Sequence, residues 1–128
     1  MNEEEQQQIF FEFQMYQQKA GQIEEQIKAV DKQINEMGEV AESLSILGRG
    51  KQKSLLPIGK GIFIKSETDN PKLLVNIGSG IIVEKTPTEA EKLINTQIQK
   101  LGGMKEHQDK ELENLHHQME ELIMKIQQ

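Results

Sequence analysis

The sequence predicts an α+β protein in which two long helices pair as an antiparallel coiled coil with a double β-hairpin inserted at its base. Two observations carry this prediction. Apolar residues recur at alternating spacings of four and three in both halves of the chain, and the stretch between them holds almost all of the strand-like sequence. The predicted divisions are a helix at 1–48, a linker at 49–54, the hairpins at 55–85 and a second helix at 86–128.

The composition suits paired helices better than a globular core. The 128 residues include no Trp, one Tyr and four Phe, and 35% are hydrophobic while 28% are charged. A narrow apolar stripe is enough for two-stranded helical packing, whereas a globule needs a larger apolar supply. The absence of Cys excludes disulfides and cysteine-ligated zinc, and it fits a cytoplasmic protein.

Charge and hydropathy argue against two classes of partner. The net charge of −6 is opposite in sign to the basic face that nucleic-acid binding needs. No apolar run approaches the length of a membrane span, and the acidic N-terminus does not resemble a signal or transit peptide. We therefore expect neither nucleic acid nor a membrane as a partner.

The first heptad pattern runs without a broken step from Ile9 to Leu44. Because a period of 3.5 is sustained over this length, it predicts a left-handed coiled coil. Gly48 is the expected C′ residue just past the helix end. The apolar positions are Ile9, Phe13, Tyr16, Ala20, Ile23, Ile27, Val30, Ile34, Met37, Ala41 and Leu44.

The second helix has the clearest start signal in the chain. Thr86-Pro87-Thr88-Glu89 reads as a capping box with proline at the first helical position. Heptad positions follow to Ile126 and are apolar except at Lys105 and Gln108, just after Gly102-Gly103. These glycines predict a loosened or bent segment, and the retained heptad phase favours one helix over two. Because the helices match in length and flank an insertion whose ends must meet, we expect antiparallel pairing.

The inserted stretch contains four strand-like runs punctuated by glycines at positions where hairpin turns need positive φ. The runs are continuously apolar rather than alternating, which predicts burial of both faces. About thirty residues cannot cover both faces themselves, so we interpret the stretch as an oligomerisation platform. Its predicted contact residues are Leu55, Leu56, Ile62, Phe63, Ile64, Leu73, Leu74, Val75, Ile77, Ile81, Ile82 and Val83.

At the predicted tip of the coiled coil, apolar residues leave the heptad seam on both helices. Phe10 and Phe11 of the first helix and Ile123 and Met124 of the second occupy outward e and f positions. Exposed apolar residues at one level of two helices predict a binding surface, and Phe and Met adapt to many apolar partners. Alternatively, these residues close the end of the bundle or pack on another coiled-coil arm. The predicted binding set is Ile9, Phe10, Phe11, Phe13, Leu122, Ile123, Met124 and Ile126.

No pattern indicates catalysis. Gly59-Lys60 lacks the preceding glycine and the following Ser or Thr of a phosphate-binding loop. His116 with Glu120, and His117 with Glu121, have a metal-binding spacing but are explained more simply as a solvated helix face. We therefore expect a non-enzyme with no catalytic residue, no metal and no cofactor.

Two heptad helices joined by a double hairpin resemble the α-class subunit of prefoldin. Residues 56–65 resemble the first hairpin of that family and residues 74–85 the second, whereas β-class subunits carry one hairpin. The resemblance implies a hexamer of two α-class and four β-class subunits, joined through a double β-barrel. It also implies an ATP-independent chaperone of archaeal type that holds non-native proteins at the tips and passes them to a group II chaperonin. Because the sequence ends soon after Ile126, we expect no C-terminal extension for further chaperonin contacts.

Two alternatives remain open at this point. The chain could be a relative of prefoldin that assembles with itself, or a structural coiled-coil scaffold that binds one folded partner.

Overall fold

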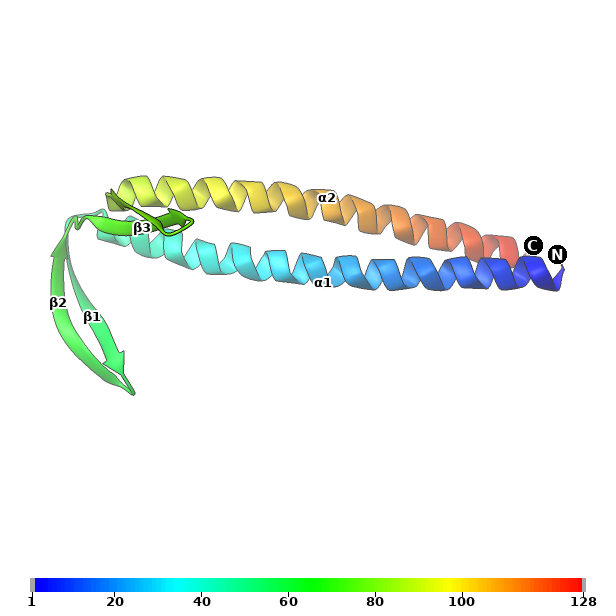
Figure 1. Cartoon of the computed structure of the whole chain (residues 1–128), viewed down its shortest axis with the longest axis horizontal. Helices are drawn as coiled ribbons and strands as arrows, with labels where there is room; N and C mark the ends of the chain where they lie inside the picture. Colours follow the sequence, from blue (N-terminus) through cyan, green and yellow to red (C-terminus); the bar gives the residue numbers. More distant parts are fainter. Residues whose placement is uncertain (1, 128) are drawn as a thin grey trace. The chain divides into compact units, whose positions relative to one another are not determined.

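The structure, a computed structural model, describes residues 2–127 as two long helices with four strands between them (Figure 1). Helix α1 spans Glu3–Leu47 and helix α2 spans Pro87–Gln127. The strands are β1 (Lys51–Gly59), β2 (Ile62–Asp69), β3 (Leu73–Gly78) and β4 (Ile81–Lys85). The predicted fold class, two long helices flanking a double β-hairpin, is confirmed.

The chain divides into two compact units that each contain part of both helices. The first comprises residues 1–34 and 100–128, and the second comprises residues 35–99. The first unit is therefore a pair of helical segments alone. The second holds the other segments of α1 and α2 together with both hairpins.

The core of the first unit is a stripe between the two helices. Ala20 and Ile23 of α1 are buried with Leu115 of α2. Tyr16, Ile27 and Leu112 pack against this cluster and are partly buried. In both units every predicted heptad position of α1 is buried or partly buried. The same is true of the heptad positions of α2, apart from Ile126, which is exposed. The predicted seam is thus the core of the helical pair.

Two polar residues of α2 interrupt the seam in the first unit. The Lys105 ammonium lies 2.7 Å from Asp31 Oδ1 of α1, and this hydrogen bond raises the pKa of Lys105. The Gln108 amide donates a hydrogen bond to Gln26 Oε1 over 3.3 Å. Polar groups at seam positions reduce stability but favour the one register in which they meet a partner. Helix α2 continues unbroken through Gly102-Gly103, so the prediction of one helix is confirmed.

Both helices begin at side-chain caps. The Thr86 N–H donates to Glu89 Oε1 at 3.1 Å, and the Glu89 N–H donates to Thr86 Oγ1 at 3.1 Å. This reciprocal pair is the predicted capping box, and Pro87 behind it is fully buried. Helix α1 has a cap that the sequence analysis missed, in which Asn2 Oδ1 accepts a hydrogen bond from the Glu5 N–H at 2.8 Å.

The connection from α1 to β1 differs from the prediction in two ways. The Gly48 N–H still bonds to the Leu44 carbonyl at 3.0 Å, and the left-handed residue is Gly50, with φ of 103°, instead of Gly48. Strand β1 begins at Lys51, so most of the stretch that we expected to be a linker is strand. The reason is that residues 51–54 pair with residues 66–69 of β2, a partner that local sequence does not reveal.

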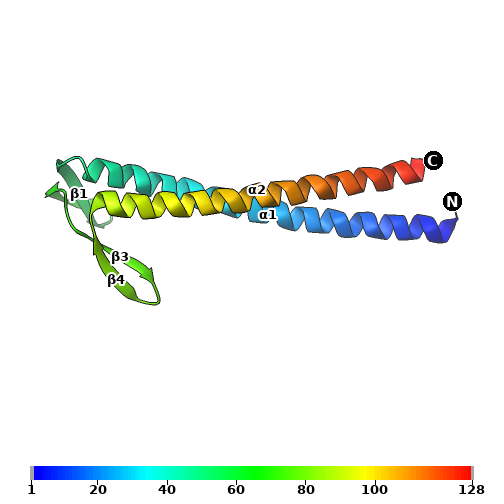
Figure 2. The same cartoon turned by 90° about the horizontal axis from the view of Figure 1, so that it is seen from above.

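Both hairpins close with the same type of turn. The sequences Ile58-Gly-Lys-Gly-Ile62 and Ile77-Gly-Ser-Gly-Ile81 repeat one pattern. Lys60 and Gly61 have φ of 45° and 79°, and the corresponding Ser79 and Gly80 have 52° and 76°. Positive φ at both central residues is what a two-residue type I′ hairpin requires. The glycine turns are therefore confirmed, and the second is visible where β3 meets β4 in Figure 2.

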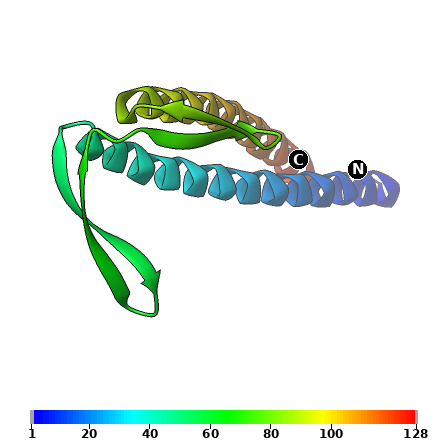
Figure 3. The same ribbon diagram turned by 60° about the vertical axis from the view of Figure 1, so that its left-hand side comes forward.

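The hairpins form two separate two-stranded antiparallel sheets, β1–β2 and β3–β4 (Figure 3). Neither sheet supplies a third strand to the other. Each therefore keeps two edges whose backbone N–H and C=O groups are not paired with a further strand of the described chain.

Replacing the cap residue Thr86 with Ala should destabilise the fold by about 1 kcal/mol, because the Glu89 N–H loses its acceptor. Urea unfolding followed by circular dichroism measures the change. Thr96→Ala is the matched control, because Thr96 lies within α2 and is exposed. Equal effects of the two substitutions would show that the Thr86 hydroxyl does not cap the helix.

The capping box also predicts a pH dependence. Hydrogen bonds from the Thr86 backbone and side chain lower the pKa of Glu89 below 4.5. A lowered pKa stabilises the folded state above the unfolded-state pKa, and this contribution is lost as pH falls through the folded-state value. Glu89→Gln should therefore be less stable than the parent at pH 7, and the difference should shrink as the pH falls below 4.5. A difference that is constant across this range would contradict the linkage.

Candidate binding surfaces

Apolar side chains from both helices are exposed in the first unit, near the first residues of α1 and the last residues of α2. The most exposed are Phe11 and Met124, at 61% and 62%. Phe10, Ile123 and Ile126 are also exposed. Phe10 and Phe11 of α1 line a shallow hollow of about 750 Å³ together with Ile126 of α2. We call these five exposed residues the tip surface.

The other three residues of the predicted binding set are buried or partly buried. Ile9 and Phe13 are partly buried in the seam. Leu122 is only 5% exposed, so its assignment to a contact surface is corrected. Its heptad position directs it between the helices, where it stabilises the pair beneath the tip surface.

Polar side chains line the hollow together with the apolar ones. Gln6, Gln7 and Gln14 contribute amides, and Glu3 contributes a carboxylate. These side chains can donate or accept hydrogen bonds to a ligand whose apolar groups contact the phenylalanines.

The sequence analysis missed Met15, which is exposed beside the tip surface. It lies four residues after Phe11, so both side chains are on one face of α1. Met15 lines a smaller hollow of about 270 Å³ with Glu12, Tyr16 and Lys19. The i,i+4 spacing from Phe11 was the signal that could have found it.

Exposed apolar side chains also occur on the helices away from the tip surface. Val40, Ile46 and Leu93 are exposed in the second unit, and Met104 is exposed in the first. Apolar exposure on the helices is therefore not confined to the tip surface. Ile46 occupies an outward f position, so its exposure follows from the heptad phase itself. These four residues provide matched controls for the tip surface.

The hairpins expose most of the residues predicted to form the platform. Leu74 is the most exposed of them at 73%, whereas Leu73, Val75 and Val83 are partly buried. Ile58 is 65% exposed and belongs with them, although the prediction omitted it. The other exposed members are Leu55, Leu56, Ile62, Phe63, Ile64, Ile77, Ile81 and Ile82.

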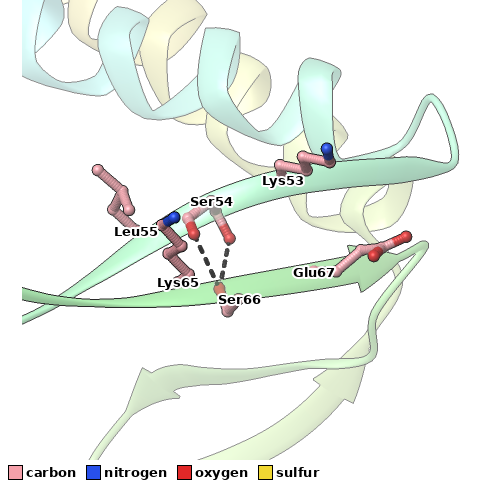
Figure 4. A pocket seen from close by; sticks show the side chains of 6 residues that line it. All are labelled: Lys53, Ser54, Leu55, Lys65, Ser66 and Glu67. Carbon is pink, nitrogen blue, oxygen red and sulfur yellow. Dashed lines mark hydrogen bonds between the residues drawn. The ribbon is translucent and has the colours of Figure 1, made fainter.

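The first hairpin is polar near the helices and apolar near its turn. The charged pairs Lys51–Asp69 and Lys53–Glu67 face each other across β1 and β2. Next to them the hydroxyls of Ser54 and Ser66 are 2.7 Å apart (Figure 4). Beyond this point the facing pairs include Leu56–Ile64 and Pro57–Phe63. The apolar half has hydrophobic residues on both faces, so only this half needs a partner to cover it.

One of the two His/Glu pairs named from the sequence is present, and the other is replaced by a contact between the helices. His117 Nε2 lies 3.3 Å from Glu121 Oε1, but His116 Nε2 lies 4.0 Å from Glu24 of α1. Among residues 2–127 no group of three or more His, Cys, Asp or Glu side chains could hold a metal ion. Within the same residues, neither helix has an apolar stretch long enough to span a lipid bilayer.

Comparison with known proteins decides which family has this architecture. The family model for the prefoldin subunit matches residues 16–128. The chain belongs to the prefoldin family. The relatives confirm the predicted α class of the subunit.

The chain is 33% identical over 115 residues to the prefoldin subunit alpha of Methanococcus maripaludis strain C7, with 78% of each chain covered. It is 35% identical over 92 residues to the prefoldin subunit alpha of Methanobrevibacter smithii, with 70% of this chain and 63% of the relative covered.

A solved prefoldin structure supports the same fold. The chain is similar, with a TM-score of 0.69 and 23% sequence identity, to a subunit of the filamentous prefoldin from Methanocaldococcus jannaschii. The similarity covers 87% of this chain and 94% of that one. The prefoldin family is a family of chaperones with archaeal members, so the chain has a chaperone role in general.

Proposed function

We propose that this prefoldin subunit is part of an ATP-independent holding chaperone that captures non-native proteins at the tip surface. The observation that carries the proposal is the exposure of Phe10 and Phe11 of α1 beside Ile126 of α2, around one hollow. Exposed apolar patches on a protein surface mark interaction sites. Non-native proteins are the partners that present apolar side chains without a fixed shape.

The chemistry of the tip surface favours weak and reversible holding. Each apolar contact stabilises a bound client by about 1–2 kcal/mol, which is too little for one subunit to retain it. Several tips on one assembly raise the effective concentration of binding sites, so weak contacts sum to a useful affinity. Phe and Met side chains repack against irregular partners, which suits a broad range of clients.

The hairpins are the proposed means of assembly. The first hairpin exposes hydrophobic residues on both faces of its apolar half, the second exposes Leu74, Ile77, Ile81 and Ile82, and each two-stranded sheet has open edges. Strands of further prefoldin subunits would cover these faces and pair with these edges. We infer assembly with β-class subunits into a hexamer of two α and four β chains, with delivery of clients to a group II chaperonin in the cytoplasm.

Removing the apolar groups of the tip surface should abolish holding. The variant Phe10→Ser, Phe11→Ser, Ile123→Ser, Met124→Ser is mixed with β-class partner subunits, and light scattering follows the aggregation of a diluted denatured enzyme without nucleotide. The concentration that suppresses half of the aggregation should rise by more than about tenfold, because several contacts of about 1 kcal/mol or more are lost.

The matched control replaces four exposed apolar residues away from the tip, as Val40→Ser, Ile46→Ser, Leu93→Ser, Met104→Ser. It should suppress aggregation like the parent, and light-scattering mass should show that both variants still assemble. If the tip variant still suppresses aggregation normally, clients bind elsewhere.

A charge at an exposed apolar residue of each hairpin should prevent assembly. Ile62→Asp with Ile82→Asp places two carboxylates where another subunit must bury apolar surface, and burying an unpaired charge is strongly unfavourable. The mass in solution should fall to that of a single chain of 14.6 kDa, while circular dichroism still shows the helices. Asn70→Asp adds a charge at an exposed residue between the hairpins and should leave the assembly intact.

The mass of the parent chain, measured alone and with β-class subunits, separates heteromeric from self-assembling prefoldin. A hexamer that forms only with β-class subunits supports the proposal. A large species formed by this chain alone would favour self-assembly, and an unchanged mass in the Asp variant would overturn the role of the hairpins.

A further inference from the structure

The two apolar surfaces of the chain carry opposite charge. Segments 3–16 and 119–127, which hold the tip surface, contain six Glu and a single Lys. The hairpin stretch 51–85 contains six Lys and three acidic residues. Both surfaces expose large apolar side chains, so apolarity alone does not distinguish them for a partner. Charge does.

Two of the glutamates adjoin the apolar hollows. Glu3 lines the hollow that contains Phe10, Phe11 and Ile126, and Glu12 lines the hollow that contains Met15, which Lys19 also lines. No Lys, Arg or His lines the larger hollow. Within residues 2–127 neither carboxylate forms an ion pair with a basic side chain, so both are available to a partner.

The helix dipoles do not cancel this negative charge. Helix α1 begins at Glu3 and helix α2 ends at Gln127, and residues from both ends line the same hollow. The partial positive charge at the start of one helix is therefore offset by the partial negative charge at the end of the other. The glutamine amides in the hollow are neutral, so the carboxylates determine the sign of the local potential.

We propose that the tip surface selects apolar segments flanked by Lys or Arg side chains. The apolar side chains of such a segment contact the phenylalanines, while its flanking cations face the surrounding glutamates. A segment with acidic flanks is repelled from the tip. This inference rests on the proposed holding function, because it states which non-native segments the tip holds.

The test uses the assembled chaperone and three fluorescent peptides with one apolar core, flanked by Lys, by Ser or by Glu. Fluorescence anisotropy gives each Kd at about 10 mM salt, where charges interact over about 30 Å, and at about 1 M, where the range is about 3 Å. At low salt the Lys-flanked peptide should bind at least about tenfold more tightly than the Glu-flanked one. At high salt the three values should agree within about twofold.

Charge variants locate the effect on the tip. The preference is the Kd of the Glu-flanked peptide divided by the Kd of the Lys-flanked peptide. Glu3→Gln with Glu12→Gln should reduce this ratio by about threefold or more at low salt, and Glu3→Lys with Glu12→Lys should reduce it further. Glu106→Gln with Glu113→Gln is the matched control, because both glutamates are exposed on α2 outside the tip segments, and it should leave the ratio unchanged. The Ser-flanked peptide reports any loss of apolar binding in each variant.

The outcomes separate this inference from the function on which it rests. Tight and equal binding of all three peptides at low salt would overturn the charge preference and leave holding at the tip intact. A preference that persists at high salt, or that the Glu106 and Glu113 variant also reduces, would likewise overturn it. Failure of every peptide to bind the parent chaperone would overturn both proposals.

Discussion

The packing of α1 against α2 along one apolar stripe is the interaction on which the rest of the structure depends. In the first unit Ala20, Ile23 and Leu115 form a buried cluster on this stripe, and in the second unit Ala41 and Leu44 are buried at heptad positions. A stripe of this kind buries few residues for each turn of helix. It has no capacity to cover apolar side chains that project from it. Because the core is a single stripe between the two helices, the tip surface and the hairpins remain exposed.

The two exposed apolar surfaces differ in their stiffness and in their backbone chemistry. The hairpins present β-branched side chains with restricted rotamers, on strands whose open edges can pair in only a few registers. Such a surface suits one defined partner. The tip surface presents Phe and Met side chains on completed helices, which have no free backbone groups along their length except at the ends. This surface can accept many partners. Under the proposed function, the hairpins would supply a specific contact for assembly and the tip surface an adaptable contact for clients.

Polar groups in the seam give the helical pair its specificity. Leu and Ile positions would tolerate a shift of the helices by one heptad, because one apolar layer resembles the next. Lys105 meets Asp31 and Gln108 meets Gln26 in a single register. Helix α2 remains intact through Gly102-Gly103, which adjoin these contacts. The same register brings Ile126 of α2 to the hollow that Phe10 and Phe11 of α1 line.

The sequence by itself determined the elements whose causes are local or periodic. These are both helices, the capping box at Thr86, the glycine turns and the seam, since hydrogen bonds within a few residues and a repeat of 3.5 set them. Tertiary structure decided what depends on residues far apart in the chain. Strand β1 starts at Lys51 because β2 offers it a partner, and Leu122 is buried because α1 lies opposite. The hollow at the tip likewise needs residues from both ends of the chain, and only the antiparallel packing of the helices brings them together.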